Sequence, residues 1–113
     1  MLNYFQHAPI SVTICDKDGK ILEMSDKSIA TFSKDGESLV GRSLLDCHPE
    51  PARTKLLGML QNQNVNVYTI EKNGVKKMIY QMPWYENDEF AGYIELSMEI
   101  PFEMPHYVRQ PKK

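Results

Sequence analysis

The dipeptide Asn73-Gly74 constrains the fold of this chain more than any other feature of its sequence. It lies between two runs, residues 65–72 and 75–84, that are rich in β-branched and aromatic residues. A two-residue type I′ turn needs a positive φ at both central positions, and Asn-Gly adopts this conformation readily. The two runs are therefore predicted to form an antiparallel hairpin.

Apolar residues recur at every second position in three segments, as they do in a strand with one buried face. They are Ile10, Val12 and Ile14 in the first segment, Met78, Tyr80, Met82 and Trp84 in the second, and Ile94, Leu96, Met98 and Ile100 in the third. A turn around Gly19 joins the first strand to another at residues 21–24. The chain is thus predicted to contain five strands, with one apolar sheet face that helices cover.

Two segments between the second and third strands are predicted to be helical. Ser25 or Asp26 can cap a short helix that ends near Asp35-Gly36. A longer helix is expected at about residues 51–63, and its apolar residues are Leu56, Leu57, Met59 and Leu60. This mixture of helices and antiparallel strands predicts an α+β domain.

Composition limits the partners and the compartment that we expect. The chain has 113 residues and a formal net charge of -2, and its basic residues are scattered apart from the last two lysines, so nucleic acid is not an expected partner. No apolar segment approaches the roughly 18 residues that cross a bilayer, so no membrane association is expected. Two cysteines in such a chain do not form a disulfide framework, which favours a cytoplasmic location.

Three local motifs occur in the order that is typical of one known family. Residues 16–21 read Asp-Lys-Asp-Gly-Lys-Ile, residues 39–45 read Leu-Val-Gly-Arg-Ser-Leu-Leu, and residues 90–94 read Phe-Ala-Gly-Tyr-Ile. They resemble the first hairpin, the entry to the long helix and the start of the last strand of PAS domains. The resemblance implies a five-stranded antiparallel sheet in the order 2-1-5-4-3 with helices packed on one face. It covers residues 8–100, with 1–7 as an N-terminal lead-in segment and 101–113 as a C-terminal tail.

The same resemblance implies a sensory signal-transduction domain that binds a small ligand between the sheet and the long helix. Its effector would be a separate protein or a domain missing from this chain. The alternative is a ligand-free protein interaction module that dimerises. We expect a homodimer in either case, because Leu2, Tyr4 and Phe5 precede the first strand and a one-layer sheet leaves one face partly uncovered.

The candidate ligand-binding residues come from two apolar surfaces that are expected to face each other, together with the segment that precedes the long helix. They are Leu44, Cys47, His48, Leu56, Met59, Leu60, Met78, Tyr80, Met82, Leu96 and Met98. Ligand sites are mostly apolar with a few polar groups that fix orientation. This set therefore favours a small apolar ligand.

Cys47 and His48 carry the most reactive side chains of that set. Both residue types bind metals, but neighbours on a loop rarely direct their side chains at one ion, and the chain offers no second pair with ligand spacing. We therefore expect no metal site. The preferred interpretation is that Cys47 packs as a small apolar residue and His48 helps to cap the helix that begins near Pro49. A haem or redox sensor that uses these two residues is the alternative.

The resemblance also bears on cofactors and catalysis. The haem-binding histidine of oxygen-sensing PAS domains falls on Leu56, and the reactive cysteine of light-sensing flavin members falls on Leu44. Neither haem nor flavin is therefore expected, although non-covalent flavin stays open. The sequence contains no motif of a hydrolase, a phosphate-binding loop or a two-histidine metal helix. The chain is accordingly not expected to be an enzyme.

Overall fold

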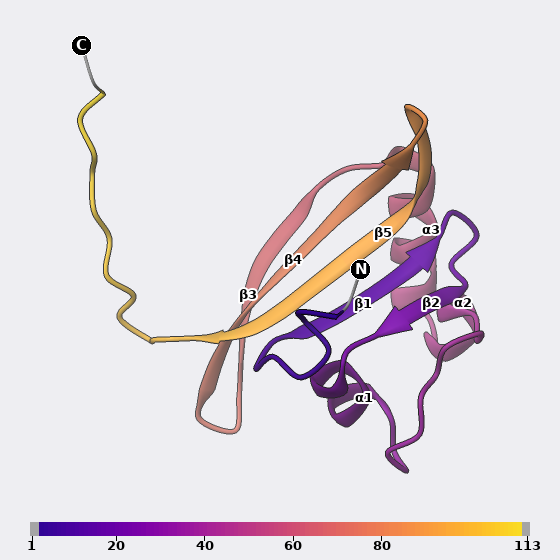
Figure 1. The fold of residues 1–113 in the computed structure, drawn as a ribbon, viewed down its shortest axis with the longest axis horizontal. Helices are drawn as coiled ribbons and strands as arrows, with labels where there is room; N and C mark the ends of the chain where they lie inside the picture. Colours follow the sequence, from indigo (N-terminus) through magenta and orange to yellow (C-terminus); the bar gives the residue numbers. More distant parts are fainter. Residues whose placement is uncertain (1–2, 112–113) are drawn as a thin grey trace.

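Eight helices and strands follow one another in the computed structural model, which describes residues 3–111 (Figure 1). They are β1 (Ser11–Asp16), β2 (Ile21–Met24), α1 (Asp26–Phe32), α2 (Leu44–Cys47), α3 (Ala52–Asn62), β3 (Asn66–Lys72), β4 (Val75–Glu86) and β5 (Glu89–Ile100). The strands form one antiparallel sheet in the order β2-β1-β5-β4-β3. The predicted α+β class and strand order are confirmed.

Two-residue turns join the last three strands. Asn73 and Gly74 have φ values of 54° and 77°, so the predicted hairpin has the positive φ at both positions that a type I′ turn requires. Asn87 and Asp88 repeat this pattern between β4 and β5, with φ values of 53° and 65°. These tight turns place β3, β4 and β5 in register along most of their length.

Two of the three helices begin at a serine cap, and the third, α3, begins at Pro51 without a side-chain cap. Ser25 caps α1 and accepts a hydrogen bond from the backbone amide of Ser28. α1 ends at Phe32, before the expected Asp35-Gly36, and α3 closely matches the expected range. The helix that we did not expect is α2, a short helix capped by Ser43 in a segment that was predicted to be a loop.

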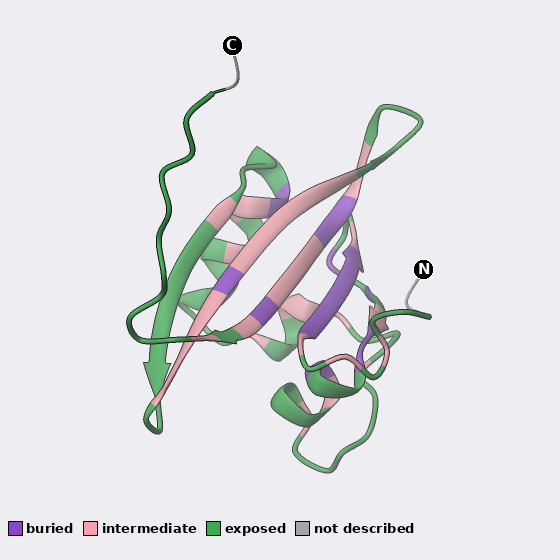
Figure 2. Cartoon of the chain, turned by 60° about the vertical axis from the view of Figure 1, so that its left-hand side comes forward, coloured by how far each residue is buried: buried purple, intermediate pink, exposed green. Residues whose placement is uncertain are grey.

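The long helix covers the opposite face of the sheet from the one that we predicted. The inner face, defined here as the one that α3 covers, carries alternate residues such as Cys15 and Tyr93, which pack against Leu56 and Met59. The other alternate residues lie on the outer face, where Val12 and Ile14 pack with Ile10, Trp84, Ile94 and Leu96. Figure 2 shows the sheet with α3 behind it. The prediction that the apolar stripe of β4 and β5 faces the long helix is therefore wrong.

The physical reason is that alternation assigns residues to a common face without saying which face the helices cover. Here the inner face is the more polar one, because it includes Thr13, Gln81 and Glu95. On the outer face Val12 and Ile14 are buried and their apolar neighbours on β4 and β5 are half-buried, and no helix of residues 3–111 covers this face (Figure 1).

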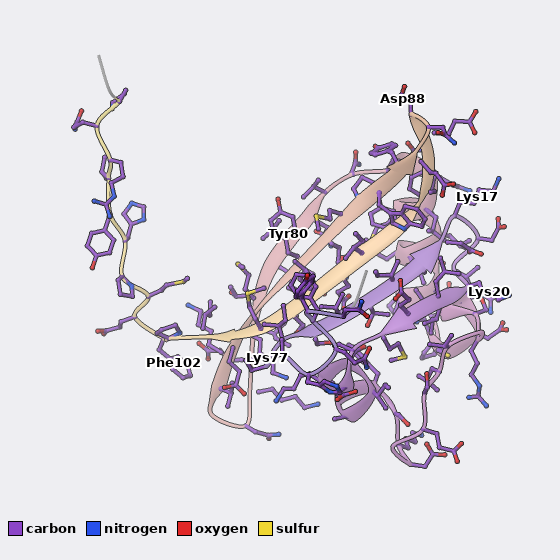
Figure 3. The ribbon with its side chains drawn as sticks, viewed as in Figure 1. Lys17, Lys20, Lys77, Tyr80, Asp88 and Phe102 are labelled. Atoms are coloured by element: carbon purple, nitrogen blue, oxygen red, sulfur yellow. The ribbon has the colours of Figure 1, made fainter. Side chains whose placement is uncertain are left out.

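Residues 101–111 leave the end of β5 and extend away from the sheet, as Figure 3 shows from Phe102 onward. All of them are exposed, and the large apolar side chains among them are Phe102, Met104, Tyr107 and Val108. The proposed limits of the lead-in segment, domain and tail stay a prediction, and part of each terminal segment, including Leu2, lies outside the described residues. None of the helices in the described range is long and apolar enough to span a bilayer.

Candidate functional site

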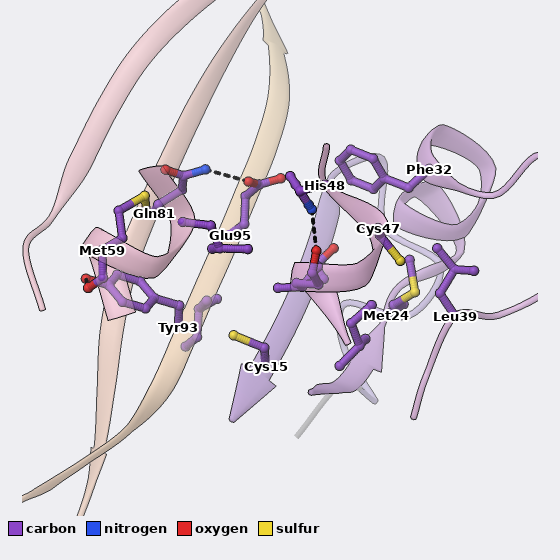
Figure 4. A pocket seen from close by; sticks show the side chains of 15 residues that line it. Cys15, Met24, Phe32, Leu39, Cys47, His48, Met59, Gln81, Tyr93 and Glu95 are labelled. Carbon is purple, nitrogen blue, oxygen red and sulfur yellow. Dashed lines mark hydrogen bonds between the residues drawn. The ribbon is translucent and has the colours of Figure 1, made fainter. Parts of the chain in front are cut away.

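A cavity of about 250 Å³ lies between the inner face of the sheet and the helices (Figure 4). The strands contribute Thr13, Cys15, Ile21, Met24, Gln81, Tyr93, Ile94 and Glu95 to its lining. The helices and the segments next to them contribute Phe32, Leu39, Leu44, Cys47, His48, Leu56 and Met59. The cavity is thus mostly apolar on the helix side and partly polar on the sheet side.

A relay of side-chain hydrogen bonds crosses three strands at the edge of the cavity. Asn66 Nδ2 donates to Gln81 Oε1 at 2.9 Å, and Gln81 Nε2 donates to Glu95 Oε2 at 2.7 Å (Figure 4). The three residues are direct partners in the sheet register, which is why their side chains line up on one face. The relay fixes the orientation of the Gln81 amide and holds the Glu95 carboxylate in place.

His48 is fixed by the last turn of α2. Its Nδ1 lies 2.6 Å from the Leu44 carbonyl oxygen, and because a carbonyl only accepts, Nδ1 must carry the proton of this bond. The expectation that His48 caps the helix beginning near Pro49 is wrong: His48 binds the carbonyl of Leu44, the first residue of α2, and follows the last residue of that helix.

Two further groups of the cavity wall are neutral near pH 7. Burial raises the pKa of the Cys15 thiol, which is only 2% exposed. Burial likewise raises the pKa of the Tyr93 hydroxyl, which lies 2.7 Å from the Met59 carbonyl oxygen and 2.9 Å from that of Asn64. Tyr93 thereby links the end of α3 to β5, and its hydroxyl is engaged with the protein itself.

An open groove of about 440 Å³ adjoins the cavity on the side of β3. The cavity and the groove share Phe32, His48, Leu56, Met59, Gln81 and Glu95. The groove also includes Lys55, Lys72 and Lys77, whereas no lysine or arginine lines the cavity. The groove gives the inner cavity a route to solvent.

The structure brings only part of the predicted site together. Leu44, Cys47, His48, Leu56 and Met59 line the cavity, and Leu60 packs beside it with Cys15 and Tyr93. The other five predicted residues lie on the outer face of the sheet, and they are Met78, Tyr80, Met82, Leu96 and Met98. Their assignment to the ligand site is corrected accordingly.

Sequence reasoning missed the polar residues of the sheet wall, namely Thr13, Cys15, Gln81, Tyr93 and Glu95. A signal for them was present in the sequence. Gln81 and Glu95 interrupt the apolar runs of two strands at alternate positions, and a polar residue in a strand between turns marks one face as different from the other.

The cavity and the adjoining groove form one open space, with volumes of about 250 and 440 Å³ and six shared lining residues. Within residues 3–111, no three His, Cys, Asp or Glu side chains come together as a metal site.

Comparisons with known proteins find solved structures of the same shape. No family model and no curated protein matches the chain. The PAS domain of BvgS from Bordetella pertussis matches with a TM-score of 0.62 at 15% identity, covering 87% of this chain and 82% of that one. A sensory box sensor histidine kinase from Vibrio cholerae gives 0.63 at 16%, covering 86% of each. A PAS domain from Colwellia psychrerythraea gives 0.56 at 20%, covering 85% and 90%.

Proposed function

The chain has the fold of PAS domains, and from this premise we propose that it is a sensory signal-transduction module that binds a small ligand in the cavity between the sheet and the helices. The observation that carries the proposal is the cavity itself. Its lining is mostly apolar with a few polar groups, which is the usual make-up of a small-molecule site.

The polarity of the inner face supports the binding of a ligand in the cavity. A sheet face that only packs against helices gains most from apolar side chains, because a polar group removed from water needs a compensating hydrogen bond. Here Gln81 and Glu95 are held in fixed orientations beside an open volume. Such preorganised polar groups reduce the cost of binding a matching ligand.

The position of β5 supports a path from the site to an effector. Tyr93 and Glu95 of β5 line the cavity, and the same strand continues into the tail at Pro101. A ligand that contacts these side chains acts on the strand that leads out of the domain. The effector itself is expected in a separate protein or in another part of a longer one.

A thermal-shift and NMR screen with small fragments tests this function. We expect binders to raise the melting temperature and to shift the backbone amide signals of Cys15, Tyr93 and Glu95. Leu44→Trp fills the cavity and should abolish these shifts, whereas Met98→Trp on the outer face should preserve them. A screen without any binder, or binders that Leu44→Trp leaves unaffected, would contradict the proposal.

A specific observation also favours a second function, homodimerisation through the outer face. From Met78 to Trp84 in β4 and from Ile94 to Ile100 in β5, the outer-face positions carry no charged side chain. An interface around a two-fold axis uses the same patch twice, and an uncharged apolar patch is complementary to itself. Tyr4 and Phe5 add exposed aromatic area at the N-terminal end.

Light scattering at micromolar concentration tests the dimer. Met98→Asp places a charge in the outer face and should shift the mass toward that of the monomer, while Lys77→Glu on the inner face is the control and should not. A monomer mass for the unmodified chain, unchanged when residues 1–7 are removed, would refute the dimer and leave the ligand proposal intact.

A further inference from the structure

The chemistry of the cavity wall narrows the ligand class. Building on the proposed function, we propose that the cavity takes a small organic cation, a protonated amine joined to a compact apolar body, with its nitrogen against the Glu95 carboxylate. The juxtaposition that carries this inference is a carboxylate held by Gln81 at the edge of a mostly apolar volume (Figure 4).

The first step is the charge of the wall. Glu95 is the one acidic side chain among the lining residues, which include no lysine or arginine. Over residues 3–111, the structure gives Glu95 no ion pair. A partly buried carboxylate without a cationic partner is costly, and a cation of the ligand would compensate it better than a neutral group.

The second step is the supply of hydrogen-bond acceptors. Gln81 Nε2 donates to Oε2 of Glu95, and the hydrogen bond from Asn66 fixes the orientation of the Gln81 amide. Gln81 therefore does not bind Oε1 of Glu95. Among the described residues, none donates a hydrogen bond to Oε1. An open carboxylate oxygen selects a ligand that donates hydrogen bonds, as an ammonium group does.

The third step is size and shape. The volume of about 250 Å³ lies near the lower end of small-molecule sites, so it favours a compact ligand. Leu44, Leu56 and Met59 offer an apolar surface to the body of the ligand, and the ring of Tyr93 lies on the same wall. An aromatic face next to a cation adds to its binding. A compact amine with one ring matches these limits.

The lysines of the adjoining groove define the competing possibility. Glu95 lines both spaces, whereas Lys55, Lys72 and Lys77 line only the groove, and within residues 3–111 none of them forms an ion pair with Glu95. They would instead favour an anionic ligand that reaches across both spaces. The geometry of the cavity wall favours the cation, and the experiment below includes the anion as a direct competitor.

Three probes of similar size, each with one benzene ring, separate these possibilities in the full chain. Uniformly ¹⁵N-labelled protein is titrated with benzylamine, benzyl alcohol and benzoate, and dissociation constants are read from the backbone amide signals of Gln81, Tyr93 and Glu95. A charge-assisted hydrogen bond contributes about 1.5–3 kcal/mol, and 1.4 kcal/mol corresponds to a tenfold change in affinity. We expect benzylamine to bind about tenfold or more tightly than benzyl alcohol, and benzoate to bind most weakly.

Two matched variants test whether the preference for benzylamine depends on Glu95. Glu95→Gln keeps the size of the side chain and an oxygen for Gln81, and it should remove the preference for benzylamine while leaving the affinity for benzyl alcohol unchanged. Glu99→Gln changes an exposed carboxylate on the same strand that does not line the cavity, and it should keep the preference. Retained affinity for benzyl alcohol shows that Glu95→Gln is folded.

The outcomes distinguish the ligand class from the function. Equal affinity for benzylamine and benzyl alcohol, tighter binding of benzoate, or a preference that survives in Glu95→Gln would each overturn the cation while leaving the ligand-binding cavity in place. If none of the three probes shifts the cavity signals at millimolar concentration, both the cation and the proposed ligand-binding function are overturned.

Discussion

Replacing Gly92 with alanine should destabilise this domain more than any other single-methyl change, because Gly92 lies where two strands and an indole ring meet. A Cβ at this position would lie 1.9 Å from the Cys15 carbonyl oxygen and 2.8 Å from the Trp84 Nε1. That nitrogen donates a hydrogen bond to the same Cys15 oxygen at 3.0 Å. The added methyl group therefore forces β1 away from β5 and displaces the indole.

Three energetic costs determine how far Gly92→Ala lowers the free energy of unfolding. Overpacking a tight site costs about 1–3 kcal/mol, and a lost hydrogen bond costs about 0.5–1.5 kcal/mol. Gly92 also has a φ of 155°, a conformation that L residues rarely adopt. We expect the free energy of unfolding to fall by about 3 kcal/mol or more, a large part of the roughly 5–15 kcal/mol of a typical domain.

Urea unfolding followed by tryptophan fluorescence measures this loss directly, because Trp84 is the single tryptophan of the chain and contacts the altered position. Gly58→Ala is the matched control. Gly58 lies in α3, where an added Cβ would meet nothing within 4 Å, so alanine should stabilise the domain by about 0.5–1 kcal/mol. If Gly92→Ala unfolds at the same urea concentration as the unmodified chain, the close approach is refuted.

Three further predictions use the same unfolding assay. Gly74→Val should cost about 1 kcal/mol or more, because a β-branched residue disfavours the φ of 77° in this turn, and an unchanged midpoint would contradict the turn. Tyr93→Phe should cost about 1 kcal/mol, since it removes the hydroxyl that links β5 to the end of α3, and equal stability would show that this link is dispensable. Hydrogen bonds from Gln6 and His7 lower the pKa of Asp26, so its stabilisation is present above its ordinary pKa and is lost as the pH falls through the lowered value. Asp26→Asn should therefore reduce the acid dependence of unfolding below about pH 4, and an unchanged pH profile would refute this contribution.

Local rules in the sequence predicted the five strands, the tight turn at Asn73-Gly74 and two of the three helices. Asn73-Gly74 forms the predicted turn, Ser25 caps the predicted helix, and the period-two pattern gives the correct strands. Each of these features depends on a few neighbouring residues and on backbone conformation, so it can be predicted from the local sequence alone. The missed helix α2 is only four residues long, and so short a segment has little periodicity of its own.

The sequence predicted only those residues of the candidate site that lie on the helices or next to them. Leu44, Cys47, His48, Leu56 and Met59 came from the chain order around the long helix, and the structure places them on the cavity. Thr13, Gln81 and Glu95 were overlooked because we assumed that the apolar side of the sheet would face the helices. The pattern alone does not exclude the reverse arrangement.

The sequence by itself determined which residues form strands and helices, where the chain turns, and which side chains share a sheet face, because these depend on periods of 2 and 3.6 residues and on turn chemistry. Only the tertiary structure decided which face α3 covers. That choice depends on contacts between segments far apart in the chain, such as Cys15 with Tyr93 and Leu60, and Gln81 with Glu95. The cavity and its carboxylate follow from that long-range packing, since a shift to the other face would place Met78 and Leu96 there instead.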